Sequence, residues 1–276
     1  MEYGNAAWGL RELPLEEQLK LTQAMGLHLL ELSIANYHRD ALQPDASAEQ
    51  IRQVKALFAQ YDVRPDCGAT GNDFTAGSAA DVRESLDRVK RAADIAAALG
   101  VKVLRIFAGF TSDSLVYGER FDRALEALQL AAEHVRGTGV RLAIETHGGV
   151  AATGDVLHHS ATVTTRIDTM RKLLESLPAA EIGMNYDPAN LAAVGDAAPE
   201  RWFGLFRDRI VLVHLKDFRD VPGGIVPAGC GEGRLDWKAL LAALKEYDGP
   251  ALIEYELPAD VEDGLRRSLR FLKQNQ

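Results

Sequence analysis

Four apolar segments in the second half of the chain each end in a side chain that can bind a metal ion. The segments cover residues 142–145, 182–187, 210–214 and 251–254, and the side chains that end them are Glu145, Asp187, His214 and Glu254. A carboxylate or an imidazole on a buried strand is costly unless a partner compensates it. One divalent cation shared by all four side chains is the simplest such partner. Three carboxylates and one histidine favour a hard or borderline cation such as Mn²⁺, Mg²⁺ or Co²⁺.

Two further polar residues follow two of these segments at a spacing of two, which places them on the same side of an extended strand. His147 follows Glu145 in this way, and Lys216 follows His214. His147 serves as an acid or base near a substrate, or it is a loop histidine that hydrogen-bonds its neighbours. Lys216 stabilises an enolate or binds a carboxylate, or it pairs with the adjacent Asp217.

The elements that must position these residues alternate between strand and helix along the whole chain. Strands are predicted over residues 3–8, 27–33, 63–68, 101–108, 140–145, 182–187, 210–214 and 251–255. Helices are predicted over residues 14–25, 47–61, 79–99, 117–136, 165–177, 199–206, 237–247 and 261–273. Apolar strands joined by crossover helices predict a parallel sheet that is buried on both faces. Eight equal units favour a closed (β/α)₈ TIM barrel over an open, doubly wound sheet.

Composition limits the classes of partner. The chain has 276 residues with no break in composition, so residues 1–276 are predicted to form one TIM-barrel domain. The formal net charge of −9 disfavours nucleic acid and anionic membranes as partners, because either would need a basic surface. Cys67 and Cys230 are expected to be reduced thiols. Residues 1–5 lack the features of a signal peptide, and no apolar stretch approaches the ~20 residues that span a bilayer, so a cytoplasmic protein is predicted.

Two long segments are predicted to be loops at the carboxyl ends of the strands, where such barrels build their active sites. The first covers roughly residues 147–164 and carries His158 and His159, and the second covers residues 216–234. Loops of this length are expected to be lids or specificity elements. We expect both histidines to be solvated.

Short motifs around these residues resemble the xylose-isomerase-like TIM-barrel superfamily, in its sugar isomerase/epimerase branch, which includes inosose dehydratase-like members. The motifs lie at residues 144–147 (Ile-Glu-Thr-His), 187–191 (Asp-Pro-Ala-Asn-Leu), 213–217 (Val-His-Leu-Lys-Asp), 231–237 and 249–254. They cover the C-terminal half well, whereas the N-terminal half matches mainly in pattern. The resemblance implies that Glu145, Asp187, His214 and Glu254 hold one divalent ion. It also implies that the two glutamates flank the substrate and relay protons.

The chain departs from the keto-sugar epimerases of this superfamily at one position. Asn190 lies three residues after Asp187, where those enzymes carry a histidine that contacts substrate. An asparagine can hydrogen-bond a hydroxyl but cannot carry a proton. Arg219 is an approximate counterpart of an arginine that follows their histidine ligand.

Four other residues are predicted to contact substrate: Glu232, Glu256, Trp8 and Phe107. Glu256 follows Glu254 on the same face of its strand. Glu232 lies in a Gly-Glu-Gly loop and reaches a substrate hydroxyl. The alternative is that it caps the helix that begins near Asp236. Trp8 and Phe107 form apolar walls of a sugar pocket, or they belong to the core.

The function predicted from these residues is metal-dependent isomerisation or epimerisation of a sugar or cyclitol, by proton abstraction next to a carbonyl through an enediolate. Dehydration of a keto-sugar or keto-inositol is the alternative. A three-zinc abasic-site endonuclease is remote, because the chain has only seven histidines and is acidic. A non-catalytic sugar-binding barrel is a further alternative, and a homo-oligomer is compatible with the sequence.

Overall fold

Eight parallel strands form one curled sheet in the computed structural model, which describes residues 1–36 and 41–276. In the spatial order of the sheet they are β1 (Glu2–Asn5), β12 (Pro250–Ile253), β9 (Ile210–Leu215), β8 (Ile182–Tyr186), β5 (Arg141–Glu145), β4 (Val103–Ile106), β3 (Cys67–Ala69) and β2 (Leu32–Ser33). The Asn5 amide donates to the Leu29 carbonyl, and the Glu31 amide donates to the Asn5 carbonyl. These two bonds join the first strand to the segment that leads into β2, so the sheet closes into a barrel.

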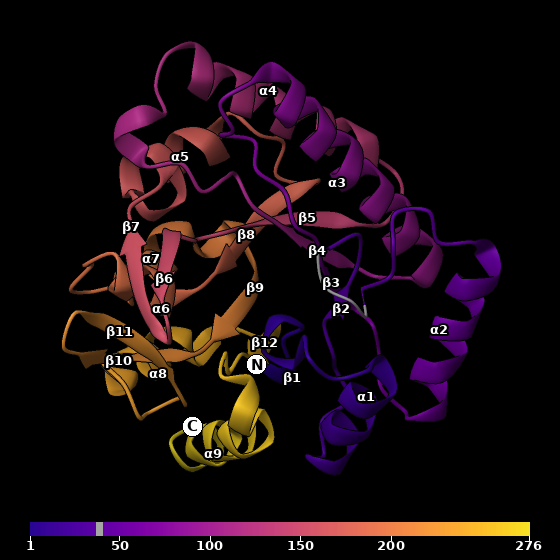
Figure 1. Ribbon diagram of the computed structural model, residues 1–276, viewed down its shortest axis with the longest axis vertical. Helices are drawn as coiled ribbons and strands as arrows, with labels where there is room; N and C mark the ends of the chain where they lie inside the picture. Colours follow the sequence, from indigo (N-terminus) through magenta and orange to yellow (C-terminus); the bar gives the residue numbers. More distant parts are fainter. Residues whose placement is uncertain (37–40) are drawn as a thin grey trace.

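Helices surround the barrel on its outside (Figure 1). They are α1 (Leu15–Ala24), α2 (Ala48–Gln60), α3 (Ala79–Leu99), α4 (Glu119–Val135), α5 (Ile167–Glu175), α6 (Pro188–Ala193), α7 (Arg201–Phe206), α8 (Trp237–Ala243) and α9 (Val261–Gln274). Local sequence explains several of their ends. The hydroxyls of Ser47 and Ser78 cap α2 and α3, and Gly100, with φ of 85°, ends α3 in the left-handed conformation. The predicted (β/α)₈ barrel is confirmed.

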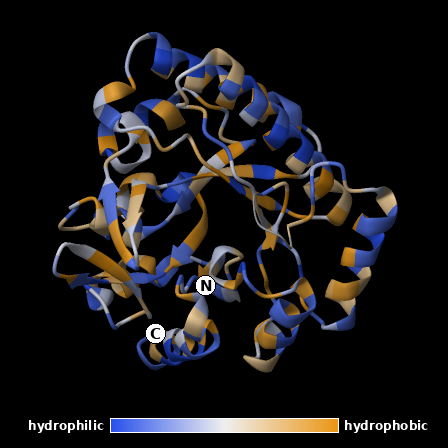
Figure 2. Cartoon of the chain, viewed as in Figure 1, coloured by the Kyte–Doolittle hydropathy of each residue, from blue (hydrophilic) through white to orange (hydrophobic). Residues whose placement is uncertain are grey.

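The hydrophobic core has two parts. A large cluster fills the space between the strands and the helices, and a small one, which includes Ala143, Leu212 and Leu252, lies inside the barrel. Figure 2 shows hydrophobic colours along the barrel strands and alternating colours on the outer helices. Across the described residues, no helix has the length and apolar composition needed to cross a bilayer. The two cysteines are buried and unpaired with each other, as expected for thiols.

The structure differs from the predicted helices and strands in three respects. The predicted strand at residues 27–33 is reduced to β2, because the residues before it pair through isolated bridges at Leu29 and Leu30. A short helix, α6, was not predicted. It begins directly after Asp187, which caps it, and Pro188 occupies its first turn, where the missing N–H is tolerated.

The third correction concerns the two predicted long loops, which are β-hairpins. The first hairpin is β6 (Gly149–Thr153) with β7 (Val156–Ser160), and the second is β10 (Asp217–Val221) with β11 (Gly224–Ala228). Their turns contain Gly154 and Gly223, both with positive φ. The hairpins meet through Ile225 and Leu157 and form one four-stranded antiparallel sheet at the side of the barrel (Figure 1). This sheet connects the segments that follow β5 and β9.

Asp217 anchors the second hairpin at the end of β9. Its Oδ1 accepts hydrogen bonds from the backbone amides of Phe218, Arg234 and Leu235 at 2.9–3.3 Å. Its Oδ2 accepts hydrogen bonds from the Gly233 amide at 3.1 Å and the Trp237 indole at 2.7 Å. Five donors are therefore satisfied by one buried carboxylate, which ties the hairpin to the start of α8.

The variant Asp217→Asn tests this anchor. An amide can replace Oδ1 as acceptor, but its NH₂ group would face the donors of Gly233 and Trp237. Leaving these two donors unsatisfied is expected to lower the free energy of unfolding by about 2–4 kcal/mol. Urea denaturation measures the change, and a loss below about 1 kcal/mol would contradict the proposed anchoring role.

Candidate metal centre

The inward-facing residues of the barrel strands form layers. The lower layer is small and apolar and includes Leu29, Ala143, Leu212 and Leu252. Side chains alternate across a strand, so the residue two positions further along also faces inward. On these four strands that residue is, in order, Glu31, Glu145, His214 and Glu254. An apolar floor is therefore followed, at the carboxyl ends of the strands, by a layer of ionisable side chains.

The predicted metal ligands lie close together. Glu145, Asp187 and His214 offer ligand atoms that are all within 4.8 Å of one another. His214 Nδ1 lies 3.8 Å from Glu145 Oε1 and 4.0 Å from Glu254 Oε2. Atoms that share one ion at about 2.0–2.2 Å are about 3–4 Å apart, so this spacing suits a single cation. All four residues are at most 4 % exposed.

Asn190 orients two of these ligands. Its backbone amide donates to Asp187 Oδ1 at 2.9 Å, in the capping bond of α6. Its side-chain amide donates to Glu145 Oε1 and to the Thr146 carbonyl, both at 3.1 Å. Among the described residues Asp187 Oδ2 has no hydrogen-bond partner, although the Lys216 ammonium lies 3.2 Å away. The contact between Asn190 and substrate stays a prediction.

Two buried cations lie among the carboxylates. Lys216 Nζ is 2.7 Å from Glu254 Oε2 and 2.7 Å from Glu256 Oε1. Lys216 therefore reaches into the centre and does not pair with the adjacent Asp217, which was the alternative. Arg105 Nε lies 3.2 Å from Glu145 Oε2. Arg105 was not predicted from the sequence, and neither was Glu31, whose Oε1 lies 3.4 Å from His214 Nε2.

The charges of this cluster fit a divalent cation. The cluster holds five carboxylates, those of Glu31, Glu145, Asp187, Glu254 and Glu256, but only two permanent cations, Arg105 and Lys216. The excess is three negative charges when His214 is neutral and two when it is protonated. Burial makes such an excess costly unless a positive charge compensates it. Both ring nitrogens of His214 also lack a hydrogen-bond partner within residues 1–36 and 41–276. The donors present are thus those that a metal such as Mn²⁺ requires.

The carboxylates of the centre differ in pKa. Burial raises the pKa of Asp187 to about 6, against the opposing effect of Lys216. Burial also raises the pKa of Glu145. Burial acts in the same direction on Glu254, but Lys216 and His214 outweigh it and lower its pKa to about 2. For His214, burial lowers the pKa, yet the carboxylates of Glu31, Glu254 and Glu145 together outweigh burial and raise it to about 9.

Aromatic rings lie beside the centre. The His147 ring makes edge contacts with Phe107 and Phe110, at centroid distances of 5.1 and 5.4 Å. His159, on β7, contacts Phe218 of β10 at 5.2 Å and so joins the two hairpins. Both ring nitrogens of His159 are buried and have no hydrogen-bond partner in the described part of the chain. The expectation that His159 is solvated is therefore wrong, because the β6–β7 hairpin folds it against β10, whereas His158 is exposed.

The pKa values of the two histidines keep both rings neutral near pH 7. Burial and the nearby Lys216 ammonium lower the pKa of His147 to about 3. Burial, His147 and Lys216 likewise lower the pKa of His159 to about 3. The two imidazoles can therefore donate or accept hydrogen bonds but carry no positive charge.

The remaining predicted residues lie at the edge of this arrangement or outside it. Glu256 joins the centre through Lys216. Glu232 is exposed, and it accepts the Gly229 amide and pairs with Arg267 of α9, so here it supports a turn. Arg219 is exposed on β10, and Trp8 is 40 % exposed under the Arg11 guanidinium.

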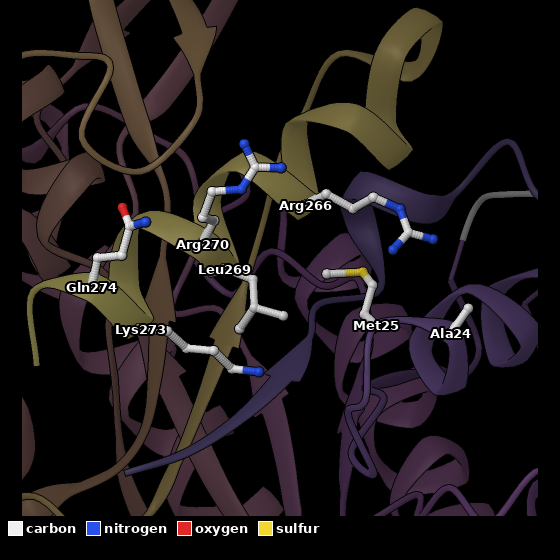
Figure 3. Close-up of a pocket in the computed structure, with 7 residues that line it drawn as sticks. All are labelled: Ala24, Met25, Arg266, Leu269, Arg270, Lys273 and Gln274. Atoms are coloured by element: carbon white, nitrogen blue, oxygen red, sulfur yellow. The ribbon is translucent and has the colours of Figure 1, made fainter.

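A separate surface groove of about 370 Å³ lies between α1 and α9 (Figure 3). Its rim carries the cationic side chains of Arg266, Arg270 and Lys273. None of the predicted site residues lines it, so it is distinct from the candidate metal centre.

Comparison with known proteins places this chain in a family. The sequence profile of the xylose isomerase-like TIM barrel family matches residues 19–275. The chain therefore belongs to the xylose isomerase-like TIM barrel family, which confirms the resemblance drawn from the motifs. None of the curated proteins matches the chain in sequence.

Solved structures share the fold at low sequence identity. The probable 3-DHS dehydratase AsbF from Bacillus anthracis, involved in petrobactin synthesis, superposes with a TM-score of 0.79 at 15 % identity over all of both chains. The IolI protein with a zinc atom gives 0.77 at 18 % identity, over 99 % of this chain and 97 % of its own. D-Allulose 3-epimerase from Methylomonas sp. in complex with D-allulose gives 0.76 at 16 %, over 100 % and 97 %. At these identities the likeness shows the fold alone.

Replacing Lys216 tests the charge balance of the cluster. Lys216→Met keeps the apolar stem but leaves Asp187, Glu254 and Glu256 without their shared counter-ion. Loss of one partner from a buried ionic group is expected to lower the free energy of unfolding of the metal-free protein by about 3–5 kcal/mol. Lys102→Met is the matched control: Lys102 pairs with Asp66 at the surface, where an ion pair contributes below about 1 kcal/mol. Equal losses in the two variants would contradict the described cluster.

His159→Phe tests the buried imidazole of the hairpin sheet. The folded protein holds the pKa of His159 below the value of about 6.5 expected in the unfolded chain, so protons bind the unfolded state preferentially below that pH. The stabilising contribution is present above pH 6.5 and is lost as the pH falls toward 3. Between pH 7 and pH 5 the free energy of unfolding of the wild type, measured by urea denaturation, should therefore fall by about 1–2 kcal/mol more than that of the variant. His158→Phe, at the exposed neighbouring position, should keep the wild-type pH dependence, and identical behaviour of all three proteins would refute the prediction.

Proposed function

We propose that the protein is a divalent-metal-dependent isomerase or epimerase that acts on a sugar or cyclitol by moving a proton on the carbon next to a carbonyl. The observation that carries the proposal is the buried excess of carboxylates around His214, at the carboxyl ends of the barrel strands. Active sites of such barrels lie at this face. The D-allulose 3-epimerase that shares this fold supports the same class of substrate.

Glu145 and Glu254 are the proposed proton carriers. Glu145 is the last residue of β5, and Glu254 lies just beyond β12. In the sheet, β8 and β9 lie between these two strands. The two carboxylates therefore reach the centre from different sides, with Asp187 and His214 between them. A divalent cation held by these four residues would polarise a carbonyl and the adjacent hydroxyl, and so lower the cost of an enediolate. One glutamate removes the proton, and the other returns it to the opposite face or to the neighbouring carbon.

Lys216 and the aromatic rings complete the proposed substrate site. The Lys216 ammonium, with its pKa held well above the usual range by Asp187, Glu254 and Glu256 against the effect of burial, stays charged beside the reacting carbons. It can stabilise negative charge that develops on a substrate oxygen. Phe107 offers an apolar ring to the carbon–hydrogen face of a sugar, and the Arg105 guanidinium holds that ring at 4.3 Å.

The polar contacts proposed for substrate differ in their support. Asn190 Oδ1 is buried and lacks a hydrogen-bond partner among the described residues, so it can accept a hydrogen bond from a hydroxyl. The His147 ring contacts Phe107 and Phe110, its Nδ1 lies 2.5 Å from the Gly148 carbonyl oxygen, and its Nε2 is proposed to hydrogen-bond the substrate. Arg219, Glu232 and Trp8 are exposed and stay predictions as contacts of the substrate.

Dehydration is the second candidate, and one observation weighs against it. Elimination of water needs a group that protonates the leaving hydroxyl. His147 is neutral near pH 7, since its pKa is about 3, and Lys216 has a pKa too high to release its proton readily. His147 and Lys216 are therefore poor proton donors, so dehydration would have to use Glu145, the carboxyl group with a raised pKa that isomerisation or epimerisation also needs as a proton carrier.

Solvent exchange tests the proposed chemistry. Keto-sugars and keto-inositols incubated with the protein and Mn²⁺ in D₂O are expected to gain deuterium at the carbon next to the carbonyl, as seen by NMR. Glu254→Gln keeps the shape of the side chain but removes its charge, and should lower kcat by about 10²–10⁴-fold. Glu262→Gln, which changes an exposed residue of α9, is the control and should exchange at the wild-type rate. Absence of exchange with every such substrate, or product enones in place of exchange, would overturn the proposal.

A further inference from the structure

Glu31 is a fully buried glutamate outside the predicted ligand set. It follows Leu29 and Leu30 and precedes β2, in a stretch that is otherwise apolar. Its Oε2 accepts a hydrogen bond from the Ala7 amide at 3.0 Å, which fixes the carboxylate to the segment that follows β1. Its Oε1 has no hydrogen-bond partner within the described residues. A buried carboxylate oxygen in this state needs a donor.

The His214 imidazole faces that oxygen. Its Nε2 lies 3.4 Å from Glu31 Oε1, whereas its Nδ1 lies 3.8 Å from Glu145 Oε1 and 4.0 Å from Glu254 Oε2. The two ring nitrogens thus face different groups. Nε2 faces one carboxylate that is fixed by the backbone, and Nδ1 faces the carboxylates of the candidate metal centre.

We propose that Glu31 is a positioning residue that sets the tautomer of His214, with Nε2–H directed at Glu31 Oε1 and the lone pair of Nδ1 directed at the centre. A proton on Nδ1 alone would leave the Nε2 lone pair against a carboxylate oxygen, which is repulsive. The contact of 3.4 Å is longer than a full hydrogen bond, so it assigns the direction of the N–H group and not a short bond. A carboxylate that accepts the second N–H of a histidine ligand also fixes the ring plane and increases the basicity of the other nitrogen.

This inference rests on the proposed function only in one respect, which is that Nδ1 acts as a metal ligand. The assignment of the proton to Nε2 depends on Glu31 and His214 alone. The two parts can therefore be tested separately, one without metal and one with it.

The first measurement uses metal-free protein labelled with ¹⁵N in its histidines. The ring shifts of His214 are recorded over a series of increasing pH until the ring is neutral, and are assigned by their loss in His214→Gln. Wild type is expected to show protonated Nε2 and unprotonated Nδ1. Glu31→Gln can present its NH₂ group to Nε2, so it should shift the population toward protonated Nδ1. The same tautomer in wild type and variant would overturn the proposal.

The second measurement is the affinity for Mn²⁺ at pH 7.5 by titration calorimetry. Glu31→Gln is expected to weaken binding by about 10–100-fold, the usual effect of losing the carboxylate partner of a metal-bound histidine. Glu262→Gln, which changes an exposed residue of α9, is the control and should bind Mn²⁺ within about 2-fold of wild type. A change below about 2-fold in Glu31→Gln would contradict the positioning role.

A further variant covers the case in which Glu31→Gln does not fold. Glu31→Asp keeps the negative charge but withdraws the acceptor from Nε2 by one methylene, and it should also weaken Mn²⁺ binding, whereas wild-type affinity would contradict the proposal. If wild type binds no Mn²⁺ yet shows the expected tautomer and its shift in Glu31→Gln, the assignment of the proton stands and the proposed metal-dependent function fails.

Discussion

The buried excess of negative charge at the carboxyl ends of the strands is the constraint on which the rest of the structure depends. Four buried carboxylates, one histidine and two cations are held in a volume from which water is largely excluded, with the partly exposed Glu256 at its edge. Each of these groups alone would be costly to bury. The barrel can hold them because its closed sheet places residues from distant parts of the chain around one axis, above an apolar floor that excludes further polar groups. The same closure makes the charges interact, so the carboxylates differ widely in pKa.

The neighbouring structure follows from this constraint. Asn190 and the start of α6 fix Asp187 and Glu145, while Lys216 links Glu254 to Glu256. The two hairpins extend the segments after β5 and β9, the strands that carry Glu145 and His214. Their antiparallel sheet brings His159 and Phe218 together, so the elements that hold two of the ligands also build the adjoining wall.

Much of the fold and four residues of the centre could be predicted from sequence, because strand alternation gives direct signals. Glu145, Asp187, His214 and Glu254 each end an apolar segment, and the closed barrel brings them together. The same spacing of two identifies Glu31 after Leu29 and Arg105 after Val103, but both lie inside runs that were interpreted only as apolar strands. A polar residue in such a run, at the inward position, is the signal that was overlooked.

Other features could not be predicted because they depend on contacts between distant segments. The turns at Gly154 and Gly223 are visible in the sequence, yet the pairing of β7 with β11 is a tertiary contact. Burial of His159 follows from that pairing, not from its local sequence. Likewise, the choice of Lys216 between Asp217 and the centre depends on where β12 places Glu254 and Glu256.

The most direct test is to measure how many Mn²⁺ ions bind to each chain of the metal-free protein. Electron paramagnetic resonance gives this number. A cation shared by the four ligands predicts one bound ion per chain. Asp187→Asn keeps the capping oxygen of α6 but removes a ligand charge, so it should bind much less Mn²⁺ than wild type. Binding of no ion, or equal binding in wild type and Asp187→Asn, would show that the buried carboxylates do not share a divalent cation.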